Sequence, residues 1–140
     1  MCGLPRSGKT TWISENKKGE IIVSADDLRY RVYDKSYWHQ GENLVWWTRE
    51  ILLRTLMSQG VDIIIDETNT TAARRKPIVD LCKGYNYECK CVFIPASVDL
   101  CISRLIESNM HLESVIARMA DKFEAPEKLE GIDEIVEIET

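Results

Sequence analysis

The segment GLPRSGKT, residues 3–10, matches the pattern G-x-x-x-x-G-K-[ST] and decides the fold. Glycines let successive backbone N–H groups curl around phosphate oxygens, and the helix that follows directs its positive N-terminal end toward them. In this pattern Lys9 reaches the outer phosphates of a nucleotide, and the Thr10 hydroxyl binds a magnesium ion. The amphipathic segment TTWISEN, residues 10–16, supports a genuine phosphate-binding loop over a chance match.

Downstream of the loop, short apolar runs alternate with helical patterns. The runs that indicate strands are residues 21–24, 61–66, 89–94 and 132–138. Helical patterns cover 42–60, 97–108, 115–123 and, less clearly, 71–83, where Pro77 would kink a helix interior. This alternation predicts an α/β fold with a doubly wound parallel sheet, whose ligands bind at the carboxyl ends of the strands. We find no repeat or linker and expect one domain over residues 1–140.

Charge and composition narrow the class of protein. The net charge is −5, but residues 124–140 hold seven acids and one base, whereas residues 1–123 hold sixteen acids and seventeen bases. A nearly neutral body lacks the broad basic footprint of non-specific duplex binding, although a few arginines can still recognise a phosphorylated end. No apolar run approaches the ~18 residues of a membrane span, so we expect a cytoplasmic protein without a membrane partner. The five cysteines are expected to be buried, reduced thiols.

Two acidic segments follow predicted strands. In VSADDLR, residues 23–29, a carboxylate is placed to accept the proton of an attacking hydroxyl, and Arg29 to hold a phosphate. The alternative is that Asp26 or Asp27 caps the next helix. In IIIDETN, residues 63–69, Asp66 or Glu67 is expected to help hold magnesium. Here too the alternative is a capping role for Asp66.

The segments GLPRSGKT, SADDLR, DETN and ASVDLCISRL together resemble the phage-type polynucleotide 5′-hydroxyl kinases and related small P-loop kinases, including zeta-toxin-like kinases. The resemblance covers essentially the whole chain, including the ending FEAPEKLEGIDEIVEI. It implies a P-loop parallel sheet of about five strands and magnesium-dependent transfer of the γ-phosphate of ATP to an alcohol. The residues it implies for ATP binding are Gly3, Pro5, Arg6, Ser7, Gly8, Lys9, Thr10 and Thr11.

The same resemblance implies further site residues. Asp26 corresponds to the general base, and Arg29 to a residue that contacts the phosphate of the acceptor. Arg104 falls where the family has a lid arginine over the transferring phosphate, and Asn69 is a candidate for contact with the acceptor. Phage-type kinases carry a second lid arginine one turn later, where this chain has Ser108; Arg118 on the next predicted helix is a candidate replacement.

The acceptor is the open question. The motifs are shared by kinases of nucleic-acid 5′ ends and by kinases of sugars, nucleosides and nucleotide sugars. We expect a polynucleotide 5′-hydroxyl first and a small-molecule alcohol second, with a non-catalytic nucleotide-binding module as the alternative from another class. Nucleobases can stack on aromatic residues, and Tyr37 and Trp38 are the best candidates, although packing is the commoner role. His39 and His111 are expected in surface or capping roles. The basic segment ARRK, residues 73–76, is expected either to contact the phosphates of the acceptor or to lie on a solvated helix face.

The position of the loop raises a separate expectation. A P-loop normally follows a buried strand, yet only Met1 and Cys2 precede Gly3. The loss of about five buried apolar residues would forfeit roughly 10 kcal/mol, as much as a whole domain typically has. We therefore expect Met1 and Cys2 to form the end of a strand that begins upstream in the working chain.

Overall fold

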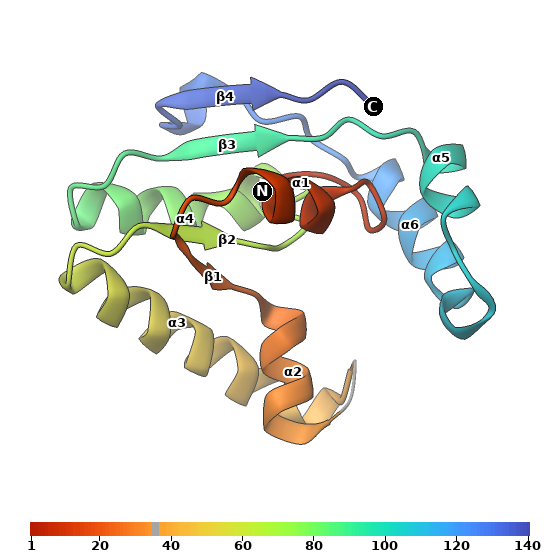
Figure 1. The fold of residues 1–140 in the computed structure, drawn as a ribbon, viewed down its shortest axis with the longest axis horizontal. Helices are drawn as coiled ribbons and strands as arrows, with labels where there is room; N and C mark the ends of the chain where they lie inside the picture. Colours follow the sequence, from red (N-terminus) through yellow and green to blue (C-terminus); the bar gives the residue numbers. More distant parts are fainter. Residues whose placement is uncertain (35–36) are drawn as a thin grey trace. The chain divides into compact units, whose positions relative to one another are not determined.

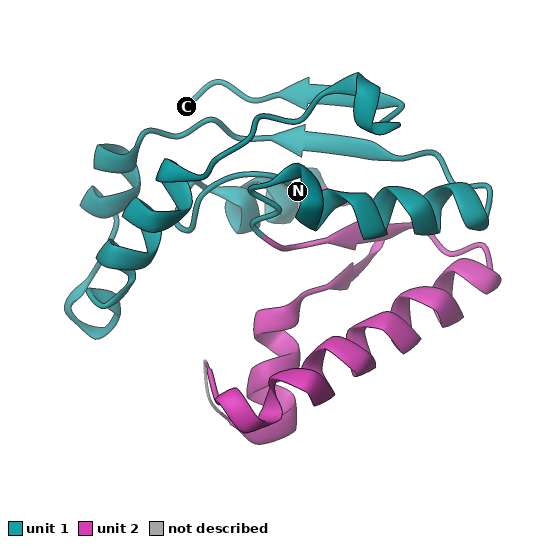
Figure 2. Cartoon of the chain, turned by 180° about the vertical axis from the view of Figure 1, so that it is seen from behind, with its two compact units in different colours: residues 1–16, 68–140 teal, residues 17–67 magenta. Residues whose placement is uncertain are grey.

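The computed structural model describes residues 1–34 and 37–140, which divide into two compact units. Unit 1 comprises residues 1–16 and 68–140, and unit 2 comprises residues 17–67 (Figure 2). The expectation of a single domain over residues 1–140 stays a prediction. Among the described residues, none of the helices has the length and apolar character needed to cross a membrane.

Unit 1 contains the phosphate-binding loop and two of the four strands (Figure 1). Its elements are α1 (Lys9–Asn16), α4 (Ala72–Gly84), β3 (Lys90–Phe93), α5 (Val98–Ser103), η2 (Glu107–Asn109), α6 (Leu112–Asp121), η3 (Lys128–Glu130) and β4 (Glu134–Glu137). Strands β3 and β4 pair in parallel, with Cys91 opposite Ile135. Strands and helical segments alternate along this part of the chain, as the apolar runs and helical patterns of the sequence predicted.

Cys2 places the phosphate-binding loop at the end of β3. Its N–H donates to Val92 O at 2.8 Å, and its carbonyl accepts from the N–H of Ile94 at 2.9 Å, which makes a parallel bridge to Phe93. Cys2 therefore pairs with β3 as a strand residue does, and the chain enters the loop at the carboxyl end of β3. Ligand sites of parallel α/β sheets lie at this end of the strands.

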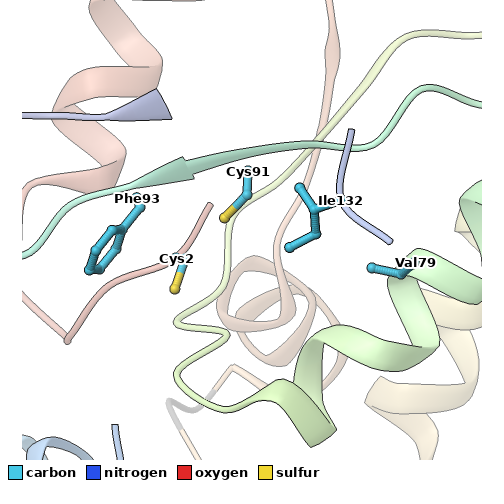
Figure 3. Close-up of a cluster of buried hydrophobic side chains, with 5 residues drawn as sticks. All are labelled: Cys2, Val79, Cys91, Phe93 and Ile132. Atoms are coloured by element: carbon cyan, nitrogen blue, oxygen red, sulfur yellow. The ribbon is translucent and has the colours of Figure 1, made fainter. Parts of the chain in front are cut away.

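Buried side chains fix this arrangement. Cys2, Cys91 and Phe93 pack with Val79 of α4 and with Ile132, which precedes β4 (Figure 3). A second cluster, around Leu4, Ala96, Cys101 and Ile116, packs the loop against α5 and α6. The five cysteines are free, as predicted, and all except the half-buried Cys89 are buried.

Two helices of unit 1 differ from their predicted extents. Ser97 caps α5, with its hydroxyl accepting from the N–H of Leu100, but α5 ends at Ser103, so the prediction of a helix through residue 108 is wrong. The Asn109 side chain accepts from the N–H of Ile106 at 2.8 Å, and such a local side-chain bond competes with helix continuation. Helix α4 continues through Pro77, so the proline does not end it.

Unit 2 contains β1 (Ile21–Val23), α2 (Ala25–Tyr33), η1 (His39–Gly41), α3 (Glu42–Ser58) and β2 (Ile63–Ile65). Strands β1 and β2 pair in parallel, with Val23 opposite Ile65. The strands of the described residues thus all pair in parallel, which confirms the predicted α/β fold. Ile21 and Ile22 are partly exposed, so β1 is not buried on both faces as its apolar run suggested. Gly60, at φ 69°, follows the end of α3, where a left-handed residue favours glycine.

Candidate active site

The loop of unit 1 has the backbone of a phosphate cradle. A Cβ on Gly3 would lie 2.8 Å from both the carbonyl oxygen of Ile94 and the Ser7 hydroxyl, so only glycine fits there. Gly8 has a φ of 110°, which strains any L-residue with a side chain. The turn is closed by a hydrogen bond from the N–H of Ser7 to the carbonyl of Leu4 at 3.1 Å. The glycines of the motif are therefore required by the shape of the loop itself.

Lys9 lies at the start of α1 with its ammonium group inside the loop. It donates to the carbonyl oxygens of Gly3 and Leu4, at 3.1 and 2.7 Å, and to the Ser7 hydroxyl at 3.5 Å. The side chain is buried, so its charge is shielded from water and directed at the loop. A buried ammonium beside a cradle of N–H groups suits the triphosphate of a nucleotide, whose negative charge it would neutralise.

Arg104, predicted as a lid residue, lies next to the same loop. Its Nη1 donates to the carbonyl of Arg6 at 2.9 Å, and lies 3.6 Å from the position that a Cβ on Gly8 would occupy. Residues separated by almost a hundred positions thus meet at one place. Arg6 itself has a φ of 64°, a left-handed backbone conformation that is uncommon for a residue other than glycine. The structure therefore brings together the loop and the arginine that the motifs assigned to the same phosphates.

The segment after Glu67 is bound to the residues before the loop. The N–H of Gly3 donates to Thr68 O at 2.9 Å, and the Asn69 side chain donates to Met1 O at 3.0 Å. Asn69 is buried and has a φ of 45°, a left-handed conformation that asparagine tolerates. Its amide therefore fixes the backbone in this structure, and its predicted contact with an acceptor stays a prediction.

Arg75 is the buried side chain that holds this segment. Its guanidinium group donates to the carbonyls of Asn69 and Glu124, at 2.9 and 2.8 Å, and forms a two-pronged ion pair with Glu130 at 2.7 and 2.8 Å. Arg75 belongs to ARRK, for which the sequence suggested acceptor phosphates or a solvated face. Arg74 is exposed, as the second alternative says, but Arg75 is buried on the face of α4 that also carries Val79.

Acid is expected to weaken the Arg75–Glu130 pair. Arg75 holds the pKa of Glu130 below its ordinary value of 4.5. A lowered pKa in the folded chain stabilises the fold above about pH 4.5, and this contribution is lost as the pH falls toward the lowered value. The difference in unfolding free energy between the wild type and Glu130→Gln should therefore shrink below about pH 4.5 in urea titrations.

Glu139→Gln, at an exposed position near the C-terminus, is the matched control for that experiment. It should unfold like the wild type at each pH. A Glu130→Gln deficit that stays constant from pH 7 to about pH 3 would contradict the assignment of the acid-sensitive stability to this pair.

In unit 2, Asp26 lies in the first turn of α2 and is paired with Arg29. Ser24 caps this helix, because its hydroxyl accepts from the N–H of Asp27, so the alternative of an aspartate cap is wrong. Arg29 Nη1 donates to Asp26 Oδ1 at 2.6 Å, and the Asp26 side chain is 82% exposed. Asp26 is thus an accessible carboxylate held by a neighbouring guanidinium group, a suitable arrangement for a base that must meet a substrate hydroxyl.

The two acids after β2 differ in their surroundings. Both oxygens of Glu67 accept from Arg49, which lies on the buried side of α3. The Trp46 ring lies beside this pair, 5.4 Å from the guanidinium carbon of Arg49. Asp66 does not cap α4, because Thr71 is the cap there. A magnesium ion that binds Glu67 would have to displace this two-pronged ion pair, and the choice between Asp66 and Glu67 stays a prediction.

A magnesium site in this chain needs few protein ligands. The structure, over the residues it describes, shows no group of three His, Cys, Asp or Glu side chains placed to hold a metal. Magnesium bound with a nucleotide commonly keeps several waters and takes one or two protein ligands besides the phosphates. The lack of a larger cluster among the described residues is therefore compatible with magnesium bound together with a nucleotide.

The remaining predicted residues have more ordinary surroundings. Trp38 packs edge-on against Tyr33 at 5.4 Å, whereas Tyr37 is exposed and its hydroxyl lies 3.3 Å from His39 Nδ1. Arg118 donates to the carbonyl of Ser114 within α6. Stacking by Tyr37 and a lid role for Arg118 stay predictions.

Sequence reasoning missed three residues that organise the site: Glu42, Arg49 and Arg75. A signal was present for two of them. Arg49 lies four residues from Val45 and Leu53 in the apolar stripe of α3, and Arg75 lies four residues before Val79 in α4. A charged residue at a buried helical position needs a partner, because an unpaired buried charge is costly.

Known proteins resemble the chain over most of its length. Residues 1–126 match the family model AAA_33, described as an AAA domain. The L-seryl-tRNA(Sec) kinase of Methanococcus maripaludis is 24% identical over 136 residues, which cover 90% of this chain and 52% of that protein. The chain thus spans about half the length of this curated relative.

Solved structures share the fold. The structure of a Pnkp1/Rnl/Hen1 RNA repair complex matches with a TM-score of 0.66 and 19% identity, over 88% of this chain and 44% of that chain. The crystal structure of APE1195 matches with a TM-score of 0.63 and 20% identity, over 96% and 80% of the two chains. At these identities the matches show the fold alone. Together with the family model, they confirm the resemblance that the motifs indicated.

Proposed function

The chain belongs to the AAA_33 family of AAA domains, and from this membership and the site geometry we propose that it is an ATP-dependent P-loop kinase. Its acceptor in this proposal is a hydroxyl group, first of all the 5′-hydroxyl of a polynucleotide. The observation that carries the proposal is the convergence of Lys9 and Arg104 on one phosphate-binding loop. An arginine beside a phosphate-binding loop is the residue type that offsets charge on a transferring phosphoryl group.

In the proposed reaction, residues of unit 1 hold the nucleotide. Backbone N–H groups of the loop and the Lys9 ammonium bind the phosphates of ATP, and Arg104 offsets the charge that spreads over the transferring group. The magnesium ion supplies additional positive charge when bound. Thr10 and one of the two acids after β2, Asp66 or Glu67, are the residues proposed to hold it.

Asp26 acts as the general base in this proposal. It accepts the proton of the acceptor hydroxyl while the oxygen attacks the γ-phosphorus, the bond from that phosphorus to the bridging oxygen breaks, and ADP leaves. Arg29 orients the Asp26 carboxylate through its 2.6 Å hydrogen bond. Protonation of Asp26 would remove both its charge and its ability to take the proton.

A second acceptor class has its own support. The curated relative is named for a kinase of L-seryl-tRNA, whose reacting group is the alcohol of an amino acid rather than a 5′ end. A seryl or other small alcohol is therefore the alternative acceptor. The geometry of the loop serves both classes, because it engages only the donor nucleotide.

A panel of acceptors tests the proposal. The protein is incubated with γ-labelled ATP, magnesium and one of five acceptors: 5′-hydroxyl RNA, 5′-hydroxyl DNA, seryl-tRNA, nucleosides or sugars. We expect label on a 5′-hydroxyl oligonucleotide, and a Lys9→Ala variant should transfer none. If a small molecule or seryl-tRNA is labelled and the oligonucleotides are not, the acceptor is a seryl or other small alcohol rather than a polynucleotide 5′-hydroxyl. ATP binding without label on any acceptor would indicate the non-catalytic module.

A further inference from the structure

All three nitrogens of the Arg29 guanidinium group donate hydrogen bonds within unit 2. Its Nε and Nη2 donate to the two carboxylate oxygens of Glu42, at 2.8 and 2.9 Å, and its Nη1 donates to Asp26. The Tyr33 hydroxyl donates to Glu42 Oε1 at 2.9 Å and fixes this carboxylate. Glu42 begins α3 and Arg29 lies in α2, so one two-pronged ion pair joins the two helices.

The two carboxylates around Arg29 are held with different strength. The Arg29 and Glu42 side chains are only 14% and 16% exposed, whereas that of Asp26 is 82% exposed. Water weakens an exposed pair far more than a shielded one, and a two-pronged pair is stronger than a single bond. Glu42 raises the pKa of Arg29, and Arg29 lowers the pKa of Glu42, which agrees with a tight pair. Glu42 is thus the main partner of Arg29.

A carboxylate and a phosphate compete for the same atoms of an arginine. Both present two oxygens at a spacing that matches the planar pair of N–H donors, so Nε and Nη2 cannot serve both at once. Arg29 is the residue that the motifs assign to a phosphate of the acceptor. An acceptor phosphate can bind there only after the Glu42 carboxylate has left.

We propose that Glu42 is a specificity-determining residue that occupies the phosphate-binding fork of Arg29 and lowers the affinity for acceptors carrying a phosphate near the reacting hydroxyl. The proposal rests on the proposed function, because it concerns the acceptor of that reaction. Its chemical basis is competition between two anions, the Glu42 carboxylate and the acceptor phosphate, for the same N–H donors of Arg29. When no acceptor phosphate is bound, Arg29 pairs with Asp26 and Glu42. Acceptors without such a phosphate do not meet this competition, whereas a polynucleotide 5′ end, whose first nucleotide carries a 3′-phosphodiester, has to displace Glu42 before its phosphate reaches Arg29.

The test compares adenosine with adenosine 3′-monophosphate, two acceptors that share a 5′-hydroxyl and differ by one phosphate. Glu42→Gln keeps the shape of the side chain but removes its charge, and so frees the fork. We expect the affinity for adenosine 3′-monophosphate to rise about tenfold, since hydrogen bonds to a charged group are strong, and that for adenosine to stay unchanged. Glu50→Gln is the matched control, because Glu50 lies on the same helix but pairs with the partly exposed Arg54.

Binding is read directly at Arg29, so that no reaction is required. The Nε–H signal of Arg29, assigned by its loss in Arg29→Lys, should shift with adenosine 3′-monophosphate at lower concentration in Glu42→Gln than in the wild type. In the double variant Glu42→Gln, Arg29→Lys, which lacks this signal, isothermal titration with adenosine 3′-monophosphate should show the same affinity as in Arg29→Lys alone. Glu42→Asp places the carboxylate one methylene farther from Arg29, so it should weaken the pair and shift binding in the same direction. This variant replaces Glu42→Gln if that variant unfolds.

Equal affinities in the wild type and both Glu42 variants would overturn the inference, as would a gain that persists without Arg29. A merely structural role of Glu42 predicts that equality, with only a lower melting temperature. If binding rises but no acceptor is phosphorylated, the inference holds and the proposed function fails. If acceptors are phosphorylated but binding is unchanged, the proposed function holds and the inference fails.

Discussion

Arg75→Met is expected to lower the free energy of unfolding by about 3–5 kcal/mol, the usual cost of removing one partner of a buried ion pair. The substitution leaves the Glu130 carboxylate, which Arg75 contacts through both oxygens, without its partner. It also removes the donor to the carbonyls of Asn69 and Glu124, which join the segment before α4 to the C-terminal part of unit 1. Urea unfolding at pH 7 measures the loss.

Arg74→Met is the matched control, because Arg74 precedes Arg75 on α4 and is exposed. Its free energy of unfolding should stay within about 0.5 kcal/mol of the wild type. Arg75→Lys should fall between the two, since an ammonium group keeps the charge but not the two-pronged pair. If Arg75→Met and Arg74→Met unfold at the same urea concentration, the ion pair does not hold the fold together as described here.

Asp26→Asn is expected to slow phosphate transfer by about 10²–10⁴-fold, the contribution typical of a general base. The amide keeps the shape of the side chain but cannot accept the proton. ATP binding should be unchanged, because the nucleotide is held by the loop of unit 1 in the proposed mechanism. The fold should be little affected, because the Asp26 side chain is largely exposed. Single-turnover transfer from labelled ATP measures the rate, and ATP titration measures the binding.

Asp27→Asn supplies the control for this prediction. Asp27 is adjacent, exposed and in the same first turn of α2, so it has the same favourable position near the helix N-terminus. Its variant should transfer phosphate at nearly the wild-type rate. Equal rates in the Asp26 and Asp27 variants would remove Asp26 from the mechanism and leave positioning and charge as the sources of catalysis.

Much of the fold could be predicted from local pattern. Helix α3 follows from its apolar stripe and from Gly60 at its end, and the strands lie within the predicted apolar runs. The loop at Gly3 to Thr10 follows from residue type, because its glycines are required by backbone shape. The extent of α5 could not be predicted in this way, because the bond between Asn109 and Ile106 competes with a continuous helix.

The sequence by itself determined the phosphate-binding loop and the α/β order of elements, because both depend on neighbouring residues. Tertiary structure alone decided the ion pairs between residues that are distant in the chain. Arg75 meets Glu130 across 55 positions, Arg49 meets Glu67 across 18, and Arg29 meets Glu42 across 13. Each pairing depends on how helices pack, and a motif records only which residue types lie close together in the chain. The same packing placed Arg104 beside the loop and Glu42 in the fork of Arg29.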